Sequence, residues 1–99
     1  MSSPRNAKKP LLSVENWAKH TPARRVTLLT KDGCHLCEDA RAVVTAVCRD
    51  TGSEFSEVDI TTDAALLRDY ANYIPVVFVD GAPWDQLRID GERLRTVLT

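Results

Sequence analysis

The amino-acid sequence predicts an α/β domain in which a four-stranded mixed β-sheet is flanked by helices, in the chain order β-α-β-α-β-β-α. Three observations support this prediction. Short runs of β-branched and apolar residues alternate with longer runs in which apolar residues recur every three or four positions. Two strands joined through a helix must be parallel, because the chain has to cross over before it pairs again. The last two strand-like runs are separated by Asp80-Gly81, a turn signal typical of an antiparallel hairpin.

The composition is that of a small soluble globular domain. The chain has 99 residues, of which 43% are hydrophobic and 27% are charged, enough apolar content for one core. The net charge of −1 gives no reason to expect nucleic acid or an anionic membrane as a partner. No apolar run approaches the roughly 20 residues that span a bilayer. Three clustered cysteines are too few for a secreted disulfide framework, so we expect a reducing, cytoplasmic location.

Residues 1–23 are predicted to be a partly disordered N-terminal extension that precedes a domain over residues 24–99. Residues 1–10 combine two prolines with several cations and have almost no apolar content, which is typical of a disordered leader. A short helix is predicted from Ser13 to His20, with Ser13 as its N-cap and with Trp17 on its apolar face. Thr21-Pro22 ends that helix.

The domain begins with a strand and a long helix. Val26–Thr30 is short, β-branched and largely apolar, as expected of a buried central strand. After a turn at residues 31–33, an amphipathic helix is predicted from about His35 to Arg49, closed by Thr51-Gly52. Cys48 falls on the apolar face of this helix, so we interpret it as a buried and inert thiol.

The remaining elements follow in chain order. They are a strand at Glu54–Ile60, a helix capped by Thr62 or Asp63 and reaching Asp69 to Tyr73, a strand at Pro75–Val79, a weaker strand at Trp84–Ile89, and a last helix that starts at Asp90-Gly91.

Cys34 and Cys37 form a C-x-x-C motif where the first strand passes into the first helix. The N–H groups and dipole of a helix N-terminus favour a negative charge, and the thiolate is the nucleophile in thiol–disulfide exchange. Lys31 is close enough in the sequence to add positive potential, whereas Glu38 and Asp39 oppose a thiolate. His35 follows Cys34 directly, as either a surface residue or a residue that tunes the redox pair. Cys37 lies one turn further on the same helix face, so it can attack a mixed disulfide formed on Cys34. The motif therefore predicts a redox dithiol.

Two other functional classes remain open at this point. A structural zinc site needs four ligands, and this chain offers one cysteine pair, so a metal or an iron–sulfur cluster would have to be shared across a dimer. A haem attachment motif would need histidine directly after Cys37, where the chain has Glu38. The third interpretation is an interaction domain in which the cysteine pair is redox-inactive.

From Arg24 to Thr99 the chain resembles the thioredoxin superfamily, and most of all its glutaredoxin-like branch. The resemblance rests on the strand–C-x-x-C–helix unit and on Ile74-Pro75-Val76 at the start of an apolar strand. It implies a thioredoxin-like fold with a cis peptide bond before Pro75, and a groove in which the backbone of Ile74 pairs with a bound peptide or thiol. It also implies a cytoplasmic, monomeric thiol–disulfide oxidoreductase of cell redox homeostasis. Such an enzyme acts on protein or small-molecule disulfides and is recharged by glutathione or a thioredoxin-type reductant.

The chain also departs from that family. Members that bind glutathione well usually have Cys-Pro-Tyr-Cys and a Gly-Gly turn before the last helix, but this chain has His35-Leu36 between the cysteines and Ile89-Asp90-Gly91-Glu92 at the turn. Lys31 does match the family's cation for glutathione, and Arg68 is a candidate for the glycine carboxylate. No bound cofactor and no metal are expected, and glutathione is a candidate co-substrate only.

Overall fold

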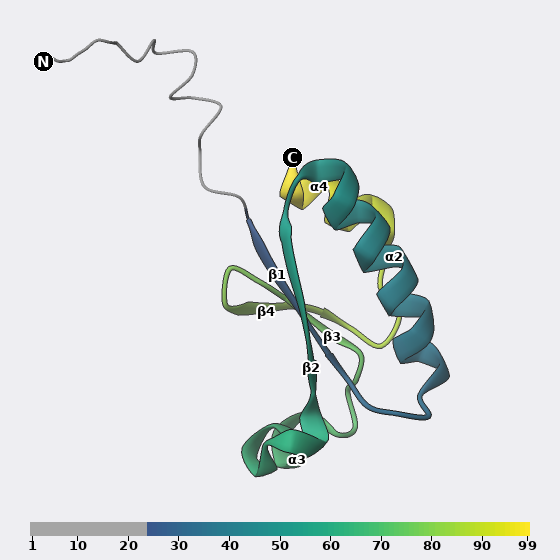
Figure 1. The fold of residues 1–99 in the computed structure, drawn as a ribbon, viewed down its shortest axis with the longest axis vertical. Coiled ribbons are helices and arrows are strands. Elements are labelled where there is room, and N and C mark those ends of the chain that lie inside the picture. The colour runs from purple at the N-terminus through teal and green to yellow at the C-terminus, as the bar shows by residue number, and fades with distance from the viewer. Residues whose placement is uncertain (1–23) are drawn as a thin grey trace, which may run out of the picture.

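The structure is a computed structural model that describes residues 24–99, and it confirms the predicted order of elements. The elements are β1 (Arg25–Thr30), α2 (His35–Thr51), β2 (Glu54–Asp59), a 3-10 helix η1 (Ile60–Thr62), α3 (Ala64–Tyr70), β3 (Val76–Val79), β4 (Ala82–Gln86) and α4 (Gly91–Leu98) (Figure 1). The leader and the short helix predicted before residue 24 lie outside the described residues. Within residues 24–99, no helix combines the length and the hydrophobicity needed to cross a lipid bilayer.

The four strands form one mixed sheet in the order β2-β1-β3-β4. β1 pairs in parallel with β2 and antiparallel with β3, and β3 pairs antiparallel with β4. The crossover through α2 and the hairpin at Asp80-Gly81 are therefore both as predicted. β1 is central, which explains why its sequence is apolar on both faces.

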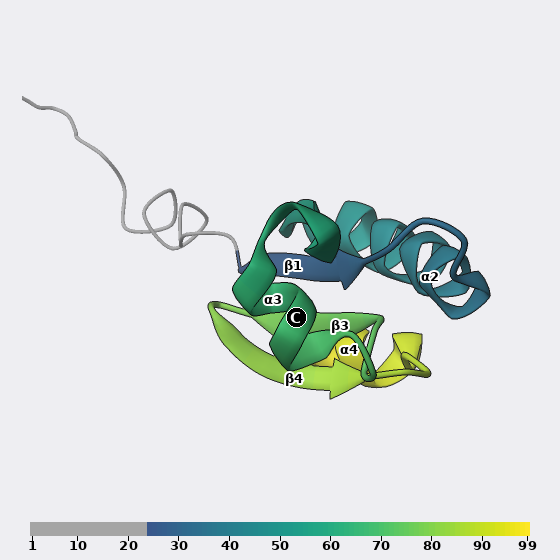
Figure 2. The same cartoon turned by 90° about the horizontal axis from the view of Figure 1, so that it is seen from below.

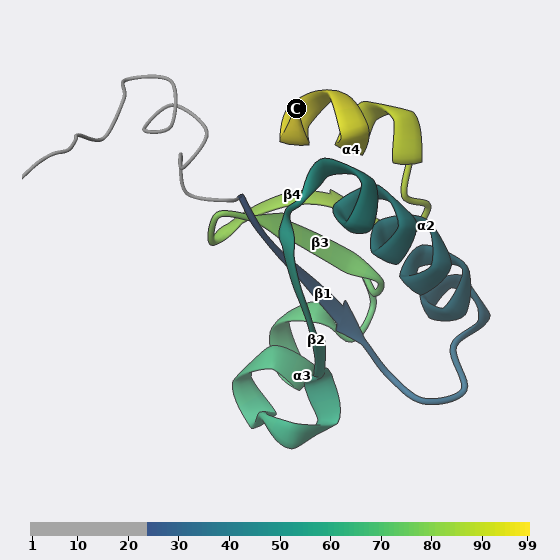
Figure 3. The same cartoon turned by 45° about the horizontal axis from the view of Figure 1, so that its top comes forward.

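The helices cover the two faces of the sheet unequally (Figures 2 and 3). On one face, α2 and α4 pack together over the strands, and Leu28, Val44 and Leu94 lie fully buried in this larger core. On the other face, the short helix α3 covers a smaller cluster centred on Leu29, Ile60 and Val76. Cys48 belongs to the larger core and is buried, as predicted.

α2 begins and ends with local signals that its sequence carries. Cys34 is its N-cap, with extended backbone angles (φ −105°, ψ 111°), and Gly52 is its C-cap in the left-handed region (φ 71°). The predicted end at Arg49 is two residues too early, because the helix continues until it reaches the glycine that adopts a positive φ without steric cost. α3 is capped by Asp63, whose carboxylate accepts hydrogen bonds from the N–H groups of Ala65 and Leu66.

The predicted bounds of the fourth strand were wrong. β4 starts two residues earlier than Trp84, at Ala82, and ends at Gln86 rather than at Ile89. Pro83 can lie within it because β4 is an edge strand, where one side of the backbone needs no ladder partner. The strand ends because Leu87 has a left-handed backbone (φ 66°), which turns the chain out of the sheet.

The second and third strands also differ by one residue from their predicted bounds. β2 ends at Asp59 because that carboxylate caps the first turn of η1, accepting a hydrogen bond from the N–H of Thr61. β3 begins at Val76, one residue after Pro75, which has no N–H to donate. These small shifts leave the pairing of the sheet unchanged.

Candidate active site

The Cys34 sulfur lies over the first turn of α2. The Cys34 Sγ accepts a hydrogen bond from the N–H of Cys37 at 3.2 Å, and the backbone carbonyl of Cys34 accepts one from the N–H of Glu38 at 3.2 Å. The sulfur thus takes the place that a serine or aspartate oxygen usually takes at a helix N-cap. Negative charge is favoured at this position, so the geometry suits a sulfur that must carry charge as a thiolate.

Cys37 occupies a different environment from Cys34. Cys34 is partly exposed, whereas Cys37 is fully buried, and all three cysteines of the chain are free thiols. Burial raises the pKa of the Cys37 thiol to about 11, and the hydrogen bond with the Cys34 side chain is the second largest cause of this rise. A hydrogen bond from the backbone of Lys31 and the charge of Arg41 both lower the pKa, but by less. At neutral pH Cys37 is therefore protonated, and the accessible sulfur of the pair is that of Cys34.

This difference predicts the order in which the thiols react. Iodoacetamide at neutral pH should modify Cys34 first, and Cys37 should become reactive only as the pH rises toward about 11. Cys48, whose pKa is also raised by burial, should stay unmodified in the folded protein. Peptide mapping after alkylation across a pH series measures all three sites at once. Modification of Cys37 before Cys34 at neutral pH would contradict this assignment.

The segment Tyr73 to Pro75 lies at the same end of the sheet as the cysteines. Val76 pairs with Leu29 near the end of β1, so Pro75, one residue earlier, lies beside the point where β1 leads into the loop to Cys34. The Ile74–Pro75 peptide bond is cis, and Pro75 is buried. Tyr73 is 46% exposed, which places an aromatic side chain on the surface next to this bond.

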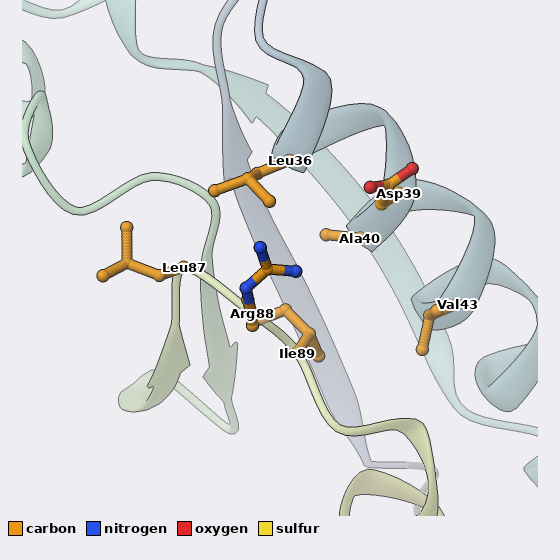
Figure 4. Close-up of a pocket in the computed structure, with 7 residues that line it drawn as sticks. All are labelled: Leu36, Asp39, Ala40, Val43, Leu87, Arg88 and Ile89. Carbon is orange, nitrogen blue, oxygen red and sulfur yellow. The ribbon is translucent and has the colours of Figure 1, made fainter.

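A small cavity separates the first half of α2 from the segment that follows β4 (Figure 4). Its volume is about 110 Å³, on the order of the space that one apolar group fills. Leu36, which stands between the two cysteines, lines it from α2, and Leu87, Arg88 and Ile89 line it from the other side. The guanidinium of Arg88 points across the gap toward α2 (Figure 4). The cavity therefore adjoins the C-x-x-C motif.

Leu87 joins this cavity to the segment that contains Pro75. Its N–H donates a hydrogen bond to the carbonyl of Pro75 at 2.8 Å, and its side chain is 40% exposed. Its positive φ is uncommon for a residue with a branched side chain, and such residues cluster at functional sites. Leu87 could not be predicted as a site residue, because nothing in the local sequence indicates a left-handed backbone at that position.

The predicted charged residues divide into two groups. Lys31 and His35 are exposed and flank Cys34. The pKa of the nearby Asp59 carboxyl is lowered mainly by the hydrogen bond from the Thr61 N–H, and the charge of Lys31 lowers it further. Arg68 lies on α3, which covers the face of the sheet opposite α2, and its guanidinium contacts the carboxylate of Asp69 at 3.0 Å. The structure thus brings Lys31 and His35, but not Arg68, together with the cysteines.

A polar network that the sequence analysis missed lies beside the first turns of α2. Arg41 donates two hydrogen bonds to Glu57 of β2, from Nε at 2.8 Å and from one terminal nitrogen at 2.6 Å. The hydroxyl of Thr30, which is buried, donates to the same carboxylate at 2.7 Å. Arg41 holds the pKa of Glu57 below its usual range, so the pair is ionised at neutral pH.

No group of three or more histidine, cysteine, aspartate or glutamate side chains within residues 24–99 is placed to hold a metal ion.

Comparisons with known proteins agree with this geometry. Residues 25–99 match the family model described as Glutaredoxin-like domain (DUF836). The X-ray structure of protein XcR50 from X. campestris is 35% identical and has a TM-score of 0.61, with 74% of this chain and 93% of that chain covered. The solution structure of protein Ne2328 from Nitrosomonas europaea is 22% identical, with a TM-score of 0.69 and coverage of 80% of this chain and 95% of that chain.

Thioredoxins share the same fold. The structure of a mutant thioredoxin from Halobacterium salinarum is 21% identical and has a TM-score of 0.58, with 78% of this chain and 73% of that chain covered. The predicted thioredoxin-like fold is therefore confirmed. No curated protein sequence matches this chain.

Proposed function

We propose that this chain, which belongs to the glutaredoxin-like domain family, is a thiol–disulfide oxidoreductase that uses Cys34 and Cys37 as its dithiol. One observation carries the proposal. A partly exposed sulfur forms the N-cap of α2, and a second, buried and protonated sulfur follows one turn later. This arrangement separates an attacking thiol from a resolving thiol, which a shared metal site or a redox-inactive pair does not need.

The reaction follows from the two environments. The Cys34 thiolate attacks one sulfur of a substrate disulfide, the substrate S–S bond breaks, and the departing sulfur takes up a proton. A mixed disulfide now joins Cys34 to the substrate. Cys37 then attacks the Cys34 sulfur, which forms an internal disulfide and releases the second substrate thiol. Two electrons have passed from the dithiol to the substrate, and an external thiol reductant restores Cys34 and Cys37.

The surroundings of Cys34 suit an extended peptide or a small disulfide. Ile74 lies at the end of the sheet beside the cysteines, just before the cis bond to Pro75, and would offer its backbone groups to a bound chain. The cavity at Leu36 and Leu87 would accept an apolar group beside the C-x-x-C motif, which contains Leu36. We further propose that the protein acts as a cytoplasmic monomer in redox homeostasis, on protein or small-molecule disulfides. Glutathione or a thioredoxin-type protein would be its reductant.

Glutathione would bind less tightly here than in relatives with a Gly-Gly turn. The N–H groups of Glu92 and Arg93, at the start of α4, donate to the Asp90 carboxylate at 3.0 and 3.2 Å. A glutamyl carboxylate would have to compete with this internal partner. The Lys31 side chain still provides positive potential near Cys34. Arg68 would contribute little, because its guanidinium is paired with the Asp69 carboxylate. Glutathione is thus proposed as a reductant and not as a tightly held ligand.

The test is to trap the mixed disulfide. A Cys37→Ser variant incubated with glutathione disulfide should gain one glutathione per chain on Cys34, because the resolving thiol is gone. The matched Cys34→Ser variant should gain none. Intact mass followed by peptide mapping reads both results. The proposal is wrong if neither glutathione disulfide nor a small aromatic disulfide modifies Cys34, or if the purified protein carries stoichiometric zinc or iron and turns over no disulfide.

A further inference from the structure

The resolving step has an electrostatic difficulty that the dithiol alone does not solve. Cys37 must become a thiolate to attack Cys34, but its sulfur is fully buried and its thiol has a pKa of about 11. A buried anion is costly unless an opposite charge lies close to it. The residues around Cys37 should therefore include a cation that helps this sulfur to ionise.

Charged and titratable groups reach Cys37 from three elements. The loop after β1 offers the backbone of Lys31, and α2 offers Cys34 and Arg41. Glu38, also on α2, acts on Arg41. β2 contributes Glu57 through its contact with Arg41. Among the side chains of residues 24–99 that act on Cys37, Cys34 disfavours the thiolate and Arg41 favours it. This singles out Arg41.

The position of Arg41 is set by contacts on both sides. Arg41 follows Cys37 by four residues on α2, and residues with this spacing lie on the same face of a helix. Its guanidinium is held against β2 by the two hydrogen bonds to Glu57, and Glu57 is held in turn by the buried hydroxyl of Thr30. An arginine anchored in this way keeps its charge beside the neighbouring turn instead of moving freely in solvent.

We propose that Arg41 is a positioning residue for the resolving step, in which its guanidinium, anchored by Glu57 and Thr30, stabilises the Cys37 thiolate as that thiolate attacks Cys34. This inference rests on the proposed dithiol mechanism. In the step itself Cys37 loses its proton, the bond between Cys34 and the substrate sulfur breaks, and the Cys34–Cys37 bond forms. The substrate sulfur leaves with the electron pair and takes up a proton, so the step needs no further reactant.

The experiment separates the two chemical steps in time. A chromogenic aromatic disulfide releases one coloured thiolate when Cys34 attacks it and a second when Cys37 resolves the mixed disulfide, and stopped-flow absorbance follows both releases. In Arg41→Gln the second release should slow by about 3- to 10-fold relative to the first at neutral pH, the effect expected of one partly solvated charge at a distance of one helical turn. The pH at which the second release reaches half its maximal rate should rise.

Three further variants show whether charge or mere packing is responsible. Arg41→Lys should recover part of the rate, because it keeps the charge but loses the bidentate geometry. Arg49→Gln removes another exposed arginine of α2, which is paired with Asp50 at the far end of the helix from Cys34 and Cys37, and should leave both releases unchanged. The double variant Arg41→Gln/Glu57→Gln should remain slow, because the cation is still missing.

The outcomes distinguish this inference from the proposed function. Equal ratios of the two releases in wild type and Arg41→Gln would overturn the role of Arg41 and leave the dithiol mechanism intact. Recovery of the wild-type ratio in the double variant would also overturn it, since Arg41 would then serve only to neutralise Glu57. If the wild type itself gives no release from Cys34, the proposed function fails instead.

Discussion

The Cys34→Ser variant is expected to lose disulfide reductase activity by on the order of 10³-fold or more, the scale seen when a covalent nucleophile is removed. The serine can replace the N-cap hydrogen bond that Cys34 Sγ accepts from the Cys37 N–H, so the helix and the fold should persist. What disappears is the partly exposed sulfur that we propose forms the mixed disulfide. Turnover of a small disulfide with a dithiol reductant measures the loss, and thermal unfolding verifies that the variant is folded.

The matched control is Cys48→Ala. Cys48 is buried in the core between α2 and the sheet, and burial raises the pKa of its thiol, so it should take no part in the exchange. Activity should therefore remain near the wild-type value even if stability falls slightly. An active Cys34→Ser variant, or an inactive but folded Cys48→Ala variant, would show that the nucleophile has been assigned to the wrong cysteine.

The second large effect is on stability. Leu94 of α4 is fully buried against α2 and the sheet, in the larger of the two cores. Leu94→Ala should lower the free energy of unfolding by about 3 kcal/mol, because it removes apolar contacts and leaves a cavity. In a domain of this size that corresponds to a fall in Tm on the order of ten degrees or more. Urea unfolding followed by circular dichroism measures the change.

Leu67→Ala provides the comparison for Leu94. Leu67 lies on α3 and is 38% exposed, so the same change of side chain should cost at most about 0.5 kcal/mol. A similar small loss at Leu94 would mean that α4 does not pack on the sheet in solution. Both variants should keep the reactivity of Cys34, because Leu94 lies on α4 and Leu67 on α3, outside the helix that carries the C-x-x-C motif.

Most of the fold could be predicted from the sequence because its signals are local. The apolar periodicity of α2, the glycine at its end and the Asp80-Gly81 turn each act through residues close together in the chain. The strand bounds were less accurate because they depend on partners in the sheet. Leu87 is the clearest example, since its left-handed backbone is held by a hydrogen bond to Pro75, the residue that precedes β3.

Some residues of the candidate site could likewise be placed from the sequence, and others could not. The positions of Cys34 and Cys37 at the start of α2 could be predicted, because a C-x-x-C motif between a strand and an amphipathic helix has few other places to lie. The resemblance made Arg68 a candidate for the glycine carboxylate of glutathione, and the structure places it on α3, over the face of the sheet opposite α2. A charge in the sequence does not reveal which face its helix will occupy.

The sequence by itself determined the order of the elements, where α2 begins and which cysteine lies outermost, because caps, turns and periodicity are properties of short segments. Only the tertiary structure decided that Arg41 meets Glu57 and Thr30, and that Leu36 and Leu87 enclose one cavity. The reason is physical. Such contacts join residues that are far apart in the chain, and they form only after the parallel pairing of β1 with β2 and the packing of α2 on the sheet have brought those side chains within reach.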